Sequence, residues 1–170
     1  MNWNNSIDVS KTIYPKIAYP SNKGGFEKAF IEFIDSDSKI NAFIKINEYC
    51  HDFANIIYIR DDGLLAHYYP DFIIKIDNKI YLVETKAEKD LNNQNVTSKR
   101  LATIDWVDKI NELLPNDRMN CTWSYVLLGE NTFYSMSQKQ ASTEEILEYA
   151  KLTKAKIKGT LSDFVGLKEY

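Results

Sequence analysis

Cysteine is scarce in this sequence: Cys50 and Cys121 are the only two, and they lie far apart without CxxC spacing. A disulfide framework or a zinc site is therefore not expected, and we predict two reduced thiols in the core. No apolar run approaches the roughly 18 residues that indicate a membrane span. The start, Met1 to Asp8, also lacks the basic-then-apolar pattern of a signal peptide. These absences predict a cytoplasmic protein.

An excess of positive charge is also missing, since the formal net charge is −3 and the sequence pI is about 5.5. A domain that holds nucleic acid unaided usually has a basic face and a high pI. Any grip of this chain alone on DNA is therefore expected to be weak. The length of 170 residues suits one domain with its own core, and the apolar share of 44% is that of an ordinary globular protein.

The pattern of apolar residues predicts a mixed α/β domain over residues 24–170, preceded by a polar arm or connector over residues 1–23. The segment order α-β-β-β-α-β-α argues for a mixed sheet flanked by helices. A helix is expected to open at Gly24-Gly25 with a buried stripe, and a capping-box pattern, Ser142 with Glu145, to open the last helix. The predicted buried stripe is Phe26, Ala29, Phe30, Phe33 and Ile34. The predicted strands are Ala42 to Asn47, Asn55 to Arg60, Tyr69 to Ile76, Lys79 to Ala87 and Thr122 to Leu128, and the later helices follow Thr97 or Ser98 and run over Thr143 to Lys156.

The chemically informative segment is a predicted antiparallel hairpin of two apolar runs joined by Asp77-Asn78. Both turn residues tolerate the left-handed backbone that a tight turn needs. A two-residue turn at this place puts Asp71 directly opposite Glu84, with Cβ atoms about 5 Å apart. Side chains repeat every two residues along a strand, so Lys86 joins them on the same face.

Two facing carboxylates repel, and a hard divalent cation would compensate them. Oxygen ligands of this kind suit Mg²⁺, for which Mn²⁺ can substitute. Such an ion polarises a phosphate and lowers the pKa of a bound water. Lys86 is placed to orient that water or to stabilise charge on the phosphate. The motif holds no cysteine or histidine, which makes zinc chemistry a poor fit.

The alternative is a structural hairpin in which Glu84 and Lys86 form a solvated strand face and Asp71 begins a strand after Pro70. Tyr81, Leu82 and Val83 immediately precede Glu84. This apolar run places the acid beside the core instead of on an open surface, which favours the functional interpretation.

The segment YYPDFIIKIDNKIYLVETKAEKD resembles the PD-(D/E)xK nucleases, and specifically the C-terminal endonuclease region of type III restriction enzyme Res subunits. The likeness covers about residues 24–114. Its most specific part is the trio Asp71, Glu84 and Lys86, whereas Glu27 and Lys99 are weaker matches. The matching residues, in order, are Gly25-Phe26-Glu27, Pro70-Asp71-Phe72, Val83-Glu84-Thr85-Lys86, Asp90, Lys99 and Trp106.

The resemblance implies a restriction-endonuclease-like fold and Mg²⁺-dependent hydrolysis of DNA phosphodiester bonds. It also implies a backbone carbonyl of Thr85 near the metal. Glu27 would complete the acidic cluster from the first helix, or else is a plain exposed helix residue. Lys99 and Arg100 begin the helix after the motif, where they would meet a DNA phosphate or lie in a solvated first turn.

Other residues of note have structural interpretations. Trp106 is expected in the core and not at a DNA contact. His51 and His67 are expected to take no part in the chemistry.

Type III Res subunits carry helicase motors, and no Gly-x-x-x-x-Gly-Lys-Ser/Thr phosphate loop occurs here. The chain is therefore interpreted as a C-terminal nuclease domain whose helicase/ATPase region lies in the same full-length chain, or as a small free-standing relative. A modification subunit would be a partner that recognises the DNA sequence.

Two other functions remain open. One is a DNA-repair or junction-resolving nuclease of the same fold, because one fold hosts many functions. The other is a non-catalytic DNA-binding module. The presence of all three motif residues, Asp71, Glu84 and Lys86, argues against it.

Overall fold

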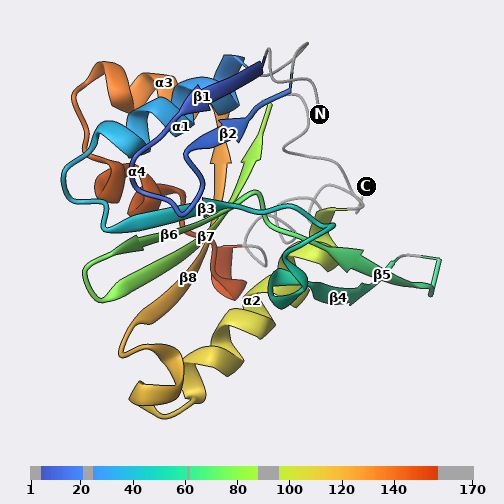
Figure 1. Cartoon of the computed structure of the whole chain (residues 1–170). Helices are drawn as coiled ribbons and strands as arrows, with labels where there is room; N and C mark the ends of the chain where they lie inside the picture. The colour runs from blue at the N-terminus through green and yellow to red at the C-terminus, as the bar shows by residue number, and fades with distance from the viewer. Residues whose placement is uncertain (1–4, 21–24, 61, 88–95, 157–170) are drawn as a thin grey trace, which may run out of the picture.

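The computed structural model describes residues 5–20, 25–60, 62–87 and 96–156. Its centre is a four-stranded sheet with the order β3-β6-β7-β8 (Figure 1). β3 (Ala42–Lys45), β6 (Phe72–Ile76) and β7 (Lys79–Lys86) are antiparallel neighbours, while β8 (Thr122–Gly129) runs parallel to β7. The prediction of a mixed sheet is therefore confirmed.

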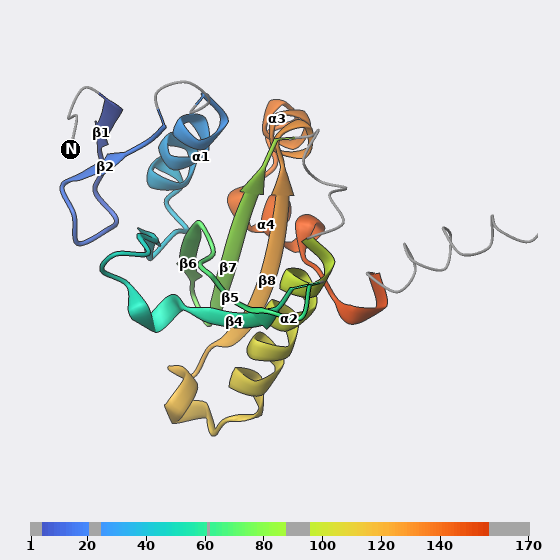
Figure 2. The same cartoon turned by 90° about the vertical axis from the view of Figure 1, so that its right-hand side faces the viewer.

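One face of the sheet is covered by three helices, α1 (Gly25–Ser36), α3 (Glu130–Gln138) and α4 (Thr143–Ala150) (Figures 1 and 2). Three rings join helix and sheet here, because Phe30 meets Phe72 and Phe133 edge-on. The stripe predicted for the first helix is buried at Phe26, Phe30 and Ile34, and partly buried at Ala29 and Phe33. Ile31, outside the predicted stripe, is also fully buried.

The other face is covered by α2 (Val96–Glu112) and a separate hairpin of β4 (Ile56–Ile59) and β5 (Leu65–Tyr68). The sequence predicts one strand from Tyr69 to Ile76. In the structure β6 begins only at Phe72, and residues 69–71 form an irregular link between β5 and β6. Pro70 lies in this break, and a proline has no N–H to donate to a ladder. The break separates Asp71 from the regular strand that follows it.

The N-terminal segment, predicted to be an arm or connector, contains a hairpin of β1 (Ser6–Asp8) and β2 (Lys16–Ala18). Its Ile17 is only 5% exposed and belongs to the core under α1. In the link between the two strands, the Lys11 carbonyl accepts from the Phe43 N–H of β3 at 2.9 Å. This part of the arm therefore packs on the domain.

The C-terminal part differs from the prediction in two ways. The helix α3 was not predicted, and α4 ends at Ala150 instead of Lys156. The ladder of β8 explains the early end, because Lys151 bridges to Val126 and the Leu152 N–H donates to the Tyr125 carbonyl. The predicted capping box of Ser142 and Glu145 is confirmed at the start of α4.

Both cysteines are free thiols, and Cys121 is buried as predicted. Cys50 is exposed, so its predicted place in the core is wrong. Trp106 lies in the apolar cluster under α2, edge-on to Trp123, as the core prediction requires. Across the described ranges, no helix is long and apolar enough to cross a membrane. Asp90 belongs to the loop that lies outside the described residues.

Candidate active site

The hairpin of β6 and β7 has the register that the sequence predicts. Its pairs run from Ile76 with Lys79 at the turn to Phe72 with Val83 at the far end. Asp77 has φ 48°, the left-handed backbone expected of the first turn residue. Asp71 and Glu84 therefore come next after the last pair of the ladder.

The Asp71 carboxylate is held from the neighbouring strand. Its Oδ2 accepts from both the Thr85 N–H and the Thr85 hydroxyl, each at 2.7 Å. Burial and the nearby charge of Glu84 raise the pKa of Asp71 to about 6, against the opposing effect of the Thr85 bonds and Lys86. Asp71 and Glu84 are thus close enough to repel each other when both are ionised.

Glu84 lies deeper, only 3% exposed, and is surrounded by donors. Its Oε1 accepts from Lys86 Nζ at 2.5 Å and from Lys99 Nζ at 3.0 Å. Its Oε2 accepts from the Tyr68 hydroxyl at 2.6 Å. These three donors compensate a charge that would otherwise be costly to bury. The structure therefore brings Asp71, Glu84 and Lys86 together.

Lys99 reaches this cluster from the first turn of α2. Its side chain is 20% exposed and its Nζ lies 3.8 Å from the centre of the Tyr68 ring. A cation over an aromatic face adds to the ion pair with Glu84. Lys99 therefore does not lie in a solvated first turn, because its ammonium group is paired with Glu84.

Arg100, the next residue, is half-buried near the same group of side chains. Burial lowers the pKa of its guanidinium, and the nearby side chains of Tyr125, Glu84 and Tyr68 act in the opposite direction. Its predicted contact with a DNA phosphate stays a prediction.

Tyr68 is a site residue that the sequence reasoning missed. Burial and the charge of Glu84 raise the pKa of its hydroxyl well above the ordinary value, so Tyr68 stays protonated and donates to Glu84. Its place in the run Tyr68-Tyr69-Pro70-Asp71 was a usable signal. A tyrosine three residues before the motif acid lies on the strand that leads into the site.

Glu27 lies on α1 and forms an ion pair with Lys45 at the end of β3. Within the part of the chain that the structure describes, no group of three or more His, Cys, Asp or Glu side chains is arranged to hold a metal ion. Glu27 therefore does not form such a group with Asp71 and Glu84 in this arrangement. Its role in the acidic cluster stays a prediction.

The two histidines have structural partners. His51 Nδ1 accepts from the Asn47 N–H at 2.9 Å, and its Nε2 lies 3.1 Å from the Tyr14 hydroxyl. His67 Nδ1 lies 3.0 Å from the Asn55 side-chain oxygen. Neither contacts Asp71 or Glu84 among the interactions of the described residues.

The donor set around Asp71 fits a small hard cation. Two carboxylates that repel each other, with no thiolate or imidazole between them, favour an oxygen-seeking ion such as Mg²⁺. The Thr85 N–H points at Asp71, and the carbonyl of a strand residue points to the same side as its N–H. The Thr85 carbonyl is therefore directed to the edge of β7 where β6 has ended.

Comparisons of the chain with protein-family models, with curated proteins and with solved structures give no match. The resemblance to PD-(D/E)xK nucleases therefore depends on the motif residues. Any functional assignment depends on the chemistry of the group formed by Asp71, Glu84, Lys86, Lys99 and Tyr68.

Proposed function

We propose that this chain is a Mg²⁺-dependent endodeoxyribonuclease domain of the PD-(D/E)xK type. The observation that carries the proposal is the pair of adjacent carboxylates, partly buried Asp71 and buried Glu84, in which burial and the charge of Glu84 raise the pKa of Asp71 beside the Lys86 ammonium. A hairpin that served only to complete the sheet would gain stability from an apolar pair at these positions. Two acids and a lysine at such positions are typical of a catalytic or metal-binding site.

In this proposal Asp71, Glu84 and the Thr85 carbonyl hold the metal ion, and the other side chains position the DNA. A bound Mg²⁺ would polarise the scissile phosphate and supply a more acidic water. Lys86, held by Glu84 at 2.5 Å, orients the attacking water or stabilises negative charge on the phosphate. Tyr68 donates to Glu84 and so fixes the direction of its carboxylate.

Lys99 adds a second ammonium group beside the scissile phosphate. It bonds to the same carboxylate oxygen as Lys86. An incoming phosphate would compete with Glu84 for these lysines, which places two positive charges where negative charge develops. Arg100 follows on the same helix and is proposed to contact the DNA backbone.

The fold proposed for this chain is restriction-endonuclease-like. Its support is the combination of an acid-bearing antiparallel hairpin with a helix, α2, that connects β7 to the parallel strand β8. The resemblance extends the proposal to the nuclease part of a type III-like restriction subunit, working with a helicase/ATPase region and a modification subunit. The net charge of −3 agrees with DNA being held mainly by such partners.

Nicking of supercoiled plasmid in Mg²⁺ or Mn²⁺ tests the proposal. Wild type should convert supercoiled to open-circular DNA, and Asp71→Asn and Lys86→Met should each reduce the rate at least about a hundredfold, as removal of a group acting on the transition state typically does. Asp108→Asn, a half-exposed acid on α2, is the matched control and should cut like wild type. Equal nicking by all four proteins, purified alike, would indicate a contaminant and contradict the proposal.

Calorimetry separates metal binding from cleavage. Saturable Mg²⁺ binding by wild type and none by Asp71→Asn would support the site even if plasmid is not cut. That result would indicate a domain that needs its motor or partner for activity. No Mg²⁺ binding by wild type in the presence of DNA would mean that the hairpin is structural.

A further inference from the structure

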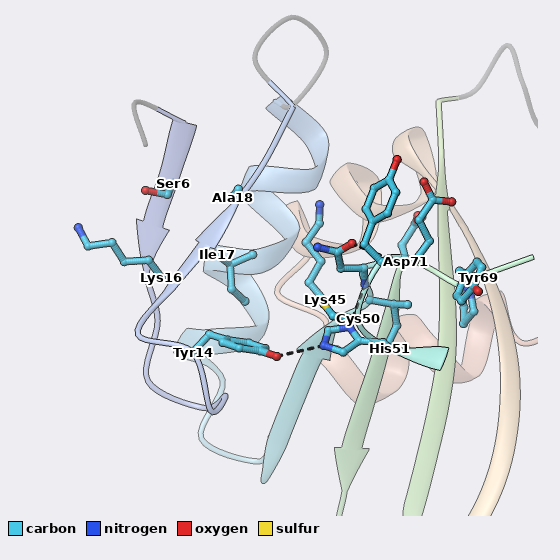
Figure 3. A pocket seen from close by; sticks show the side chains of 15 residues that line it. Ser6, Tyr14, Lys16, Ile17, Ala18, Lys45, Cys50, His51, Tyr69 and Asp71 are labelled. Atoms are coloured by element: carbon cyan, nitrogen blue, oxygen red, sulfur yellow. Dashed lines mark hydrogen bonds between the residues drawn. The ribbon is translucent and has the colours of Figure 1, made fainter. Parts of the chain in front are cut away.

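A cavity of about 580 Å³ lies beside Asp71 (Figure 3). Asp71 lines it, whereas Glu84, Lys86, Lys99 and Tyr68 do not. Its walls come from three separate segments: the N-terminal hairpin, residues 45–51 after β3, and residues 69–71. This volume falls within the range of about 300–1,000 Å³ that is usual for small-molecule sites. Because Asp71 is one of the lining residues, a group that fills the cavity is adjacent to the candidate catalytic carboxylate.

Aromatic rings line this cavity from all three segments. Tyr14 comes from the hairpin, Tyr49 and His51 from the loop after β3, and Tyr69 from the segment before Asp71. Tyr49 is 87% exposed, so its ring contributes little to the core. Exposed aromatic rings beside a groove are the usual platform for stacking the bases of single-stranded nucleic acid.

The hydrogen bonds of His51 fix a donor in the cavity. His51 Nδ1 accepts from the Asn47 N–H, so it carries no proton, and the ring proton lies on Nε2. Nε2 then donates to the Tyr14 oxygen at 3.1 Å, as the dashed line in Figure 3 marks. The hydroxyl proton of Tyr14 therefore remains available for an acceptor inside the cavity. His51 is itself only 5% exposed, which holds this arrangement in place.

Two lysines add positive charge to the same walls. Lys16 is paired with Asp8 at 3.3 Å, but both side chains are about half-exposed or more, so water screens the pair. Lys45 is paired with Glu27. The charge of Lys45 is thus compensated, and the acids Glu48 and Asp71 also line the cavity. A ligand that carries a phosphate would meet the Lys16 ammonium, an aromatic platform and the Tyr14 hydroxyl together.

We propose that this cavity binds one unpaired nucleotide of the strand that is cut, so that the preferred substrate has unpaired bases at the cleavage point. A base in a duplex is stacked and paired and cannot enter a pocket of this size without leaving the helix. The Tyr49 ring stacks on the base, Tyr14 donates to one of its acceptors, and Lys16 attracts the phosphate. This inference rests on the proposed function, since it is the cut strand that passes Asp71.

Fluorescence anisotropy in EDTA tests the inference without any cleavage. The probes are a labelled single-stranded DNA of mixed sequence and the same sequence in a blunt duplex. Wild type should bind the single strand more tightly than the duplex. Tyr49→Ala should weaken single-strand binding about tenfold, the effect expected when one stacking aromatic is removed, and leave duplex binding unchanged. Tyr14→Phe, which keeps the ring and removes the donor, should weaken it by a smaller factor.

Tyr149→Ala is the matched control, because this tyrosine is 68% exposed on α4 and does not line the cavity. Tyr49 is exposed, so its replacement leaves the core intact, and a thermal melt checks each variant. Equal binding of single strand by wild type, Tyr49→Ala and Tyr149→Ala would overturn the inference.

Cleavage assays distinguish this inference from the proposed function. If plasmid nicking is lost in Asp71→Asn but single-strand binding is insensitive to Tyr49, only the inference fails. If single-strand binding depends on Tyr49 but wild type neither binds Mg²⁺ nor cuts plasmid, the cavity binds an unpaired nucleotide and the nuclease proposal fails.

Discussion

Asp71, which is partly buried, and Glu84, which is buried, are adjacent acids with unequal compensation. Glu84 receives two ammonium groups and a hydroxyl, whereas Asp71 receives two neutral donors from Thr85. Burial and the charge of Glu84 outweigh these two donors and raise the pKa of Asp71 to about 6. Ionised Asp71 therefore costs stability in the metal-free protein, which is typical of a residue kept for function.

Asp71→Asn is expected to stabilise the metal-free protein at pH 7 to 8. The folded pKa of about 6 exceeds the ordinary value of 3.8, so the folded state binds the proton more tightly and stability falls as pH rises between these values. Asparagine removes that penalty, an effect of about 1–3 kcal/mol at most. Urea unfolding of both proteins across pH, in EDTA, measures it.

The difference between the two proteins should shrink as the pH falls from 6 through 3.8, because below 3.8 Asp71 is largely protonated in both the folded and unfolded states. Asp108→Asn, a solvent-exposed change, should show no comparable gain. A destabilised Asp71→Asn at every pH would mean that the Thr85 hydrogen bonds outweigh burial and repulsion.

At the scale of elements, the N-terminal hairpin is the part whose role is least evident from the sequence. β1 and β2 form their own small sheet, yet Ile17 on β2 enters the core and Tyr14 between the strands reaches His51 (Figure 3). The hairpin thus connects the core under α1 with the cavity beside Asp71. Its integrity should affect both the stability of the domain and the shape of that cavity.

Ile17→Ala is expected to lower the free energy of unfolding by about 2–4 kcal/mol, as removal of a buried isoleucine side chain usually does. Ile13→Ala in the same segment is the matched control, since Ile13 is 81% exposed, and should change it by less than about 0.5 kcal/mol. Chemical denaturation of the two variants measures both values. Equal effects would mean that the hairpin does not pack on the core in solution.

At the scale of the whole molecule, the sheet positions the acids and the two helical layers supply what surrounds them. α2 and the β4–β5 hairpin provide Lys99 and Tyr68 from the face opposite α1. The same layers bury Glu84. A cation bound by these acids would therefore stabilise the entire fold and not one loop.

Mg²⁺ is expected to raise the melting temperature of wild type and not that of Asp71→Asn. With about 10 mM Mg²⁺ and a Kd near 1 mM, linkage gives about 1.4 kcal/mol, or roughly 3–6 °C for a chain of this size. Differential scanning fluorimetry measures the shift, with NaCl of equal ionic strength as the control. The same rise in both proteins would locate the ion elsewhere.

The features that depend on residues close together in the chain were predictable without knowledge of the fold. The turn at Asp77-Asn78 fixes the pairing of two adjacent apolar runs, and the two-residue period of a strand then assigns Glu84 and Lys86 to one face. The stripe of α1 and the capping box of α4 follow from equally local rules. The trio of Asp71, Glu84 and Lys86 was predictable for this reason.

The surroundings of that trio depend on contacts between distant parts of the chain. The packing of α2 on the sheet brings Lys99 to Glu84, and the separate hairpin of β4 and β5 brings the Tyr68 hydroxyl to the same carboxylate. The cavity needs Tyr14 and His51, which are 37 residues apart, to meet. Such contacts depend on how whole helices and strands pack. Hydrophobic periodicity, turn residues and helix caps do not specify the angle at which a helix crosses a sheet.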